Sequence, residues 1–150
     1  MPEAPEPRTP QLVLAFDFGK KRIGIACGDT LSGTASPLAA VTANAGLAPW
    51  EAITALVREW QPALAVVGLP YNADGSESAM AAAARAFAAA LAHRCALPVE
   101  LVDERYSSLE AGTRLKNARE AGLRKRRIAK TDIDSAAACV ILERWIRGET

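Results

Sequence analysis

The chain has 150 residues, of which 50% are hydrophobic, so it can fold as a single domain around a substantial core. The formal net charge of +1 leaves the class of partner open, and the three cysteines fit no zinc-ligand spacing, which suggests reduced thiols of a cytoplasmic protein and no cysteine nucleophile. No apolar run is long enough to span a membrane, so no membrane partner is expected.

Residues 1–10 carry four prolines among polar residues, which predicts a disordered tail. The segment has no apolar core of the signal-peptide kind. We therefore assign the folded domain to residues 11–150.

The stretch from Leu12 to Asp29 predicts a buried strand, a glycine turn and a second strand. Asp17 stands at the end of the first strand, and Gly19 opens the turn. A charge at this place is costly unless a partner or metal compensates it, although a strand-end aspartate can also simply cap a turn. The cations of the turn are Lys20, Lys21 and Arg22.

The next elements predict an α/β domain. A third strand over 34–41 should complete an antiparallel meander with the first two. A helix over 50–60 has one apolar face, and its tryptophans, Trp50 and Trp60, are expected in the core rather than in base stacking.

A buried strand over 64–69 is followed by a polar loop and an alanine-rich helix that ends near Arg94. Ser76 is the expected N-cap of this helix. The strand–loop–helix order places Asn72 and Asp74 at the carboxyl end of the sheet, where α/β proteins bind ligands. An ordinary βα turn is the alternative interpretation.

The last strand is expected over 98–104 and ends in adjacent acids. Because neighbouring strand residues point to opposite faces, only one of Asp103 and Glu104 can share the side of Asp17. Ser107 and Glu110 fit a capping box of a following helix, which explains Glu110 structurally.

A basic run extends over 114–130 and is either a solvated surface or a site for the phosphate backbone of nucleic acid. The cations assigned to nucleic-acid binding are Arg124, Lys125, Arg126, Arg127 and Lys130.

The final helix is expected from near Thr131 to about Ile146. Asp134 is spaced from Ala138 and Ile141 so that it shares their stripe, which predicts an inward carboxylate. Asp132 lies about 200° away round the helix and is interpreted as a first-turn acid favoured by the helix dipole.

Three carboxylates therefore stand out, on Asp17, Glu104 and Asp134. If the first and last strands lie near each other in a parallel sheet, the three side chains can converge. Hard divalent cations prefer such oxygen ligands, and two ions about 4 Å apart can activate a water and stabilise the leaving oxygen in phosphodiester cleavage.

Four segments, DFGKKRIGIACGD, VVGLPYNADGSES, VDERYSSLEA and KTDIDSAAACVIL, together resemble the YqgF/RuvX family of Holliday-junction-resolvase-like proteins and pre-16S rRNA nucleases. The resemblance covers about Leu12 to Arg147. It implies an RNase H-like fold, a five-stranded mixed sheet flanked by helices, and a bacterial cytoplasmic protein that matures the 5′ end of 16S rRNA.

Carried over residue by residue, the family's acidic triad falls on Asp17, Glu104 and Asp134. The implied mechanism is hydrolysis with Mg²⁺ or Mn²⁺, in which Asp17 binds both ions and the other two acids hold one each. The loop departs from many relatives at Tyr71 and Ala73, and Tyr-Ser-Ser follows the DER motif; neither departure touches the triad.

Three alternatives stay open. A four-way DNA junction resolvase would act on branched DNA as a dimer, whereas an RNA nuclease could be a monomer or a dimer. An actin-like phosphate-binding domain also opens with Asp-x-Gly between two strands, but it needs a second domain. A nucleic-acid-binding module without catalysis is the third, and the intact carboxylates argue against it.

Overall fold

The computed structural model describes residues 11–19, 21–43, 47–70, 78–103 and 135–148. These residues form a five-stranded sheet of order β3-β2-β1-β4-β5 and three helices. The strands are β1 (Leu12–Phe18), β2 (Arg22–Asp29), β3 (Ala35–Thr42), β4 (Leu64–Leu69) and β5 (Val99–Asp103). The helices are α1 (Trp50–Trp60), α2 (Ala79–Cys95) and α5 (Ala136–Ile146).

The predicted meander is confirmed. β1 pairs with β2, and β2 with β3, in antiparallel ladders, and the β1–β2 register runs from Leu12 opposite Asp29 to Phe18 opposite Ile23. β4 then joins the other side of β1 in parallel, and β5 joins β4 in parallel. The sheet is therefore mixed, as expected. β1 and β5, the first and last strands along the chain, are separated in the sheet by β4 alone.

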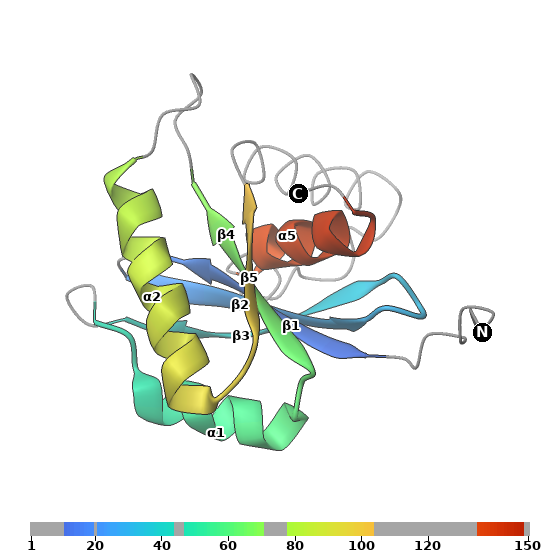
Figure 1. The fold of residues 1–150 in the computed structure, drawn as a ribbon, viewed down its shortest axis with the longest axis horizontal. Coiled ribbons are helices and arrows are strands. Elements are labelled where there is room, and N and C mark those ends of the chain that lie inside the picture. Colours follow the sequence, from blue (N-terminus) through green and yellow to red (C-terminus); the bar gives the residue numbers. More distant parts are fainter. Residues whose placement is uncertain (1–10, 20, 44–46, 71–77, 104–134, 149–150) are drawn as a thin grey trace, which may run out of the picture.

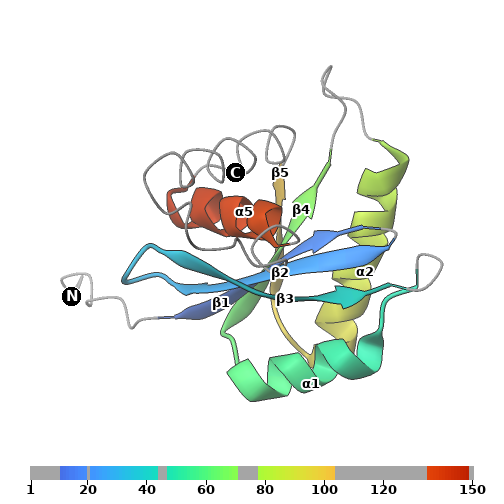
Figure 2. The same ribbon diagram turned by 180° about the vertical axis from the view of Figure 1, so that it is seen from behind.

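Helices cover both faces of this sheet. Figures 1 and 2 show α1 and α2 on one side and α5 on the other. Each side has its own apolar cluster, the larger beneath α1 and α2 and the smaller beneath α5. Because β1 is central and covered twice, Val13, Leu14, Ala15 and Phe16 are all fully buried, which explains their uninterrupted apolar run.

The tryptophans of α1 belong to the core. Trp50 stacks on Phe87 of α2 with ring centroids 5.4 Å apart, and the Arg94 guanidinium lies 4.8 Å from the Trp50 ring. Trp60 is half-buried against the same cluster, and Ile53 between them is fully buried. The expectation of core packing is confirmed.

Two predicted helix starts are wrong. The N-cap of α2 is Ser78 and not Ser76, because the Ser78 hydroxyl accepts a hydrogen bond from the Ala81 amide at 3.0 Å. Helix α5 begins at Ala136 and not near Thr131, and Ser135 occupies its N-cap position. Residues 131–134 lie outside the described part of the chain.

The predicted N-terminal tail, residues 1–10, also lies outside the described residues. Among the helices that the structure describes, none is both long and apolar enough to cross a membrane.

Candidate active site

Asp17 is held in place by the phenylalanines on either side of it. Phe16 and Phe18 point to the face covered by α1 and α2, where their rings lie 5.7 and 5.1 Å from that of Phe87. Alternation along β1 therefore directs the half-buried Asp17 side chain to the opposite face, the one beneath α5.

The turn after Asp17 is tight and needs a glycine. A Cβ on Gly19 would lie 2.5 Å from the carbonyl oxygen of Arg22, closer than real contacts allow. Lys21 and Arg22 are exposed at this turn, so two of the three predicted cations lie close to the carboxyl end of β1. The third, Lys20, lies outside the described residues.

The glycine contact leads to a stability prediction. Gly19→Ala should lower the free energy of unfolding by about 1–3 kcal/mol, because the added methyl group forces the Arg22 carbonyl to move. Chemical denaturation measures this loss. Lys21→Ala in the same turn is the control and should change stability by less than about 0.5 kcal/mol, because its side chain is exposed.

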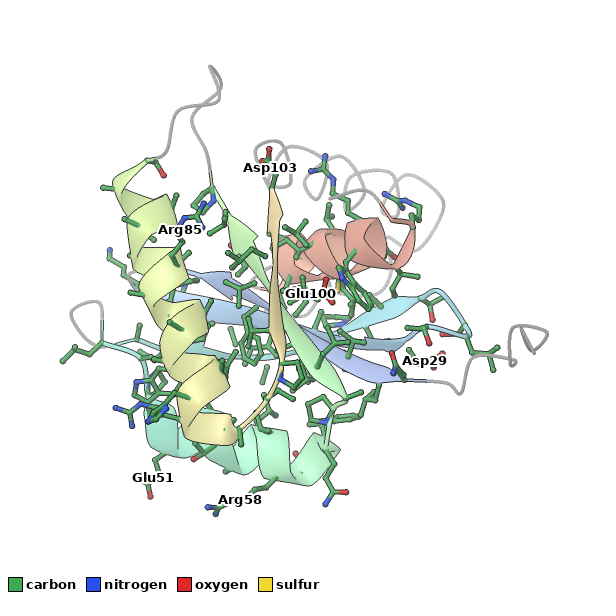
Figure 3. All side chains as sticks on the ribbon, viewed as in Figure 1. Asp29, Glu51, Arg58, Arg85, Glu100 and Asp103 are labelled. Atoms are coloured by element: carbon green, nitrogen blue, oxygen red, sulfur yellow. The ribbon has the colours of Figure 1, made fainter. Side chains whose placement is uncertain are left out.

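The carboxyl ends of β4 and β5 lie side by side. The β4–β5 ladder ends with Leu69 opposite Asp103, and Figure 3 shows Asp103 at the tip of β5. After β4, the Ser78 hydroxyl donates a hydrogen bond to the Pro70 carbonyl at 2.5 Å. Leu69 and Asp103 thus end their strands at the same edge of the sheet, and the predicted site residues Asn72 and Glu104 follow them in the sequence.

Face alternation separates Asp103 from its neighbour in sequence. Val102 is buried beneath α5 in one cluster with Val13 and Ala15 of β1, the strand positions that share a face with Asp17. Asp103 therefore takes the face opposite to that of Asp17. Its main chain is tied to α5, because Arg144 donates a hydrogen bond from Nη1 to the Asp103 carbonyl at 3.1 Å.

The start of α5 is fastened next to the strand partner of Asp17. Asp17 pairs with Gly24, and the amide of the following residue, Ile25, donates to the Ser135 hydroxyl at 3.0 Å. That hydroxyl donates in turn to the Leu38 carbonyl at 2.7 Å. Residues 103 and 135, which bracket the segment containing two predicted acids, are thus both held by hydrogen bonds on the α5 side of the domain.

The other predicted site residues cannot be placed. They lie outside the described residues, and they are Asn72, Asp74, Glu104, Arg124, Lys125, Arg126, Arg127, Lys130, Asp132 and Asp134. Within the part of the chain that is described, no three acidic, histidine or cysteine side chains form a metal-binding group. Convergence of the acidic triad therefore stays a prediction.

The Asp29 carboxylate and the thiols of Cys27 and Cys95 are not candidates for the active site. Asp29 pairs with Leu12 at the amino end of β1, and Figure 3 shows it at the far end of the β2–β3 hairpin. Its carboxylate accepts hydrogen bonds from the Ser32 and Leu31 amides, which lower the pKa of Asp29 and fix the turn. Burial raises the pKa of the Cys27 and Cys95 thiols, the direction opposite to the lowered pKa that activates a cysteine nucleophile.

Sequence reasoning missed three residues at this edge: Ser135, Arg144 and Arg85. Arg85 lies on α2 near the carboxyl end of β4 (Figure 3), and it is the one charged residue between Glu77 and His93. A single charged residue in an alanine-rich helix is a sequence feature that could have drawn attention to Arg85. Ser135 and Arg144 contact residues that are distant in the sequence. No local sequence pattern predicts such contacts.

A family model described as RuvX Holliday junction resolvase matches residues 11–148, nearly the whole chain. The chain belongs to the RuvX family. Relatives in this family include a protein of Legionella pneumophila strain Philadelphia 1, which is 46% identical over 134 residues, 89% of this chain and 94% of that protein. A protein of Edwardsiella ictaluri is 44% identical over 140 residues, 93% of this chain and 97% of the relative. Both are provisionally named pre-16S rRNA nuclease.

The RuvX chain also shares its fold with a solved junction resolvase. Thermus thermophilus RuvC in complex with a Holliday junction substrate superimposes with a TM-score of 0.56 at 13% identity, covering 92% of this chain and 97% of RuvC. A second structure of Thermus thermophilus RuvC gives a TM-score of 0.54 at 12% identity, covering 92% of this chain and 97% of that chain. The RNase H-like fold expected from the sequence is confirmed.

Proposed function

We propose that this RuvX-family nuclease is a metal-dependent phosphodiester hydrolase whose metal ligands are Asp17, Glu104 and Asp134. The observation that carries the proposal is the shared face of the sheet. Asp17 points to the α5 side, and the alternation that buries Val102 on that side favours Glu104 over Asp103 as its partner. Asp134 directly precedes Ser135, which is anchored beside the strand partner of Asp17.

The donor set suits a hard divalent cation. Three carboxylates supply oxygen ligands, and the described part of the chain contributes the half-buried Asp17 at a strand end. When bound, Mg²⁺ or Mn²⁺ supplies a Lewis acid for the attacking water and for the charge on the leaving oxygen.

Cations around this edge would hold the substrate. Lys21 and Arg22 are exposed at the turn beyond Asp17, where they can bind phosphates flanking the scissile bond. Lys20, Asn72 and Lys130 are proposed for the same task. The basic cluster, defined as Arg124, Lys125, Arg126 and Arg127, would extend the phosphate contacts further along the bound nucleic acid.

The proposed substrate is precursor 16S rRNA, cleaved near its 5′ end. The names of the relatives at 44% and 46% identity support this choice. The test is to incubate the purified protein with labelled precursor RNA and with a four-way DNA junction, each with Mg²⁺, with Mn²⁺ and with chelator. Metal-dependent cleavage of RNA, with the junction left intact, is the expected result.

A four-way DNA junction is the second candidate substrate. The description of the matching family model favours it, and the chain shares the fold of RuvC. Symmetric cleavage of the junction and no cleavage of RNA would establish this alternative, and the enzyme should then be a dimer. Binding of both substrates without cleavage would instead indicate a non-catalytic module.

Replacing all four residues of the basic cluster with alanine should weaken nucleic-acid affinity for every sequence and flatten its salt dependence. Each lost phosphate contact should reduce the slope of log affinity against log salt by about one unit. Fluorescence anisotropy across a salt series measures the slope. An unchanged slope would identify the cluster as a solvated surface.

A further inference from the structure

Arg85 is an isolated charge on the surface of α2. The helix has no other charged residue between Ala79 and Ala92, and the positions three and four residues away from Arg85 on either side are all alanine. An ion pair with a neighbouring turn of the same helix, a common reason for an arginine on a helix surface, therefore does not account for it. The Arg85 side chain is exposed among these short side chains, which leave a large ligand room to approach.

The fold directs Arg85 to the carboxyl edge, defined as the edge of the sheet where β1, β4 and β5 end. α2 begins at this edge, where the Ser78 hydroxyl binds the Pro70 carbonyl just after β4. The Phe87 ring centroid lies 5.1 Å from that of Phe18, the last residue of β1. Arg85 lies about 3 Å nearer the start of the helix, and helical side chains lean toward that end. Figure 3 accordingly shows Arg85 near the carboxyl end of β4.

Arg85 lies at the border between the buried and the exposed sides of α2. Ala81 and Ala88, about one turn away in either direction, are buried, whereas Ala82 and Ala89 are exposed. A long side chain at such a border can lay its methylene groups along the domain and keep its charged end in solvent. The guanidinium can therefore serve a ligand that crosses the carboxyl edge.

The carboxyl edge has exposed cations on both sides of Asp17. Lys21 and Arg22 lie on the side of β2, and Arg85 lies on the side of β4. β2 and β4 flank β1, so they are two strand spacings apart, about 10 Å. A few successive phosphates of one nucleic-acid strand, at about 3.4 Å per nucleotide along the helix axis, cover that span.

We propose that Arg85 binds a phosphate of the substrate and leads the strand from Asp17 across the carboxyl edge onto the α2 side of the domain. The inference rests on the proposed function, because it takes the scissile phosphate to lie at Asp17. The fork of N–H donors on a guanidinium matches two oxygens of one phosphate. Contacts of this kind position a strand without reading its sequence, so the ligand is the phosphodiester backbone.

The experiment measures affinity for labelled single-stranded RNA in chelator across a salt series. Arg85→Gln should weaken the affinity about 2–10-fold and reduce the slope of log affinity against log salt by about 0.7. Arg85→Lys keeps the charge and should keep the slope. In cleavage assays with metal, Arg85→Gln should raise KM and leave kcat at the wild-type level, because Arg85 contacts no reacting atom.

Arg58→Gln is the matched control. It removes the same charge from an exposed position on the same side of the sheet, in the last turn of α1 and away from the carboxyl edge (Figure 3), so slope and KM should not change. A wild-type slope and KM in Arg85→Gln, or an equal loss in Arg58→Gln, would overturn the inference and leave the proposed function standing. Wild-type cleavage by Asp17→Asn would instead remove the proposed metal site, and with it the path of the strand from Asp17.

Discussion

Asp17→Asn, Glu104→Gln and Asp134→Asn should each reduce cleavage by about 10³-fold while the protein stays folded. Each amide keeps the shape of the carboxylate and loses its charge. A catalytic metal stabilises the transition state by several kcal/mol, and each 1.36 kcal/mol lost lowers the rate tenfold. Single-turnover cleavage at saturating metal measures the loss. Circular dichroism of each variant establishes that the fold is retained.

Neighbouring acids are the matched controls for this prediction. Asp103→Asn changes a carboxylate on the opposite face of the sheet from Asp17, so most activity should remain. Asp132→Asn should also retain activity, because a first-turn acid is interpreted as a dipole partner. Inactive Asp132→Asn beside active Asp134→Asn would show that the helix-stripe argument chose the wrong residue.

The fold was largely predictable because each strand can be recognised from its own local sequence. β1 is an unbroken apolar run since helices cover both of its faces, and short connections make β1, β2 and β3 a meander. Asp17 was predictable for the same reason, as a charge that ends a buried strand. The apolar face of α1 followed from helical periodicity.

The helix starts failed where tertiary contacts override local rules. Ser76 and Ser78 are both reasonable caps, and Ser78 is chosen by the Pro70 carbonyl that its hydroxyl also binds. At the last helix, the Ser135 hydroxyl binds strand residues 97 and 110 positions away in the sequence. A window of neighbouring residues cannot reveal such contacts, so the anchor of the candidate site was not predicted.

The three proposed carboxylate ligands carry negative charge, so binding of a metal ion should change the stability of the fold. Three converging carboxylates repel one another without a cation, so the metal-free site should destabilise the fold. A cation that binds the folded site and not the unfolded chain stabilises it, by roughly 2.7 kcal/mol at 100 times the dissociation constant. Mg²⁺ or Mn²⁺ should therefore raise the Tm of the wild type progressively with concentration.

Asp17→Asn removes one repelling charge and one ligand at once, so its two effects on Tm should have opposite signs relative to the wild type. In chelator the variant should melt at a higher temperature, because the repulsion is relieved. On addition of metal its Tm should rise little, because the binding free energy is lost. Thermal melts of both proteins across a titration of Mg²⁺ and Mn²⁺ measure the two shifts. Equal metal-induced shifts in the two proteins would place the cation away from Asp17, whereas the predicted crossing of the two curves would place it at the carboxyl end of β1.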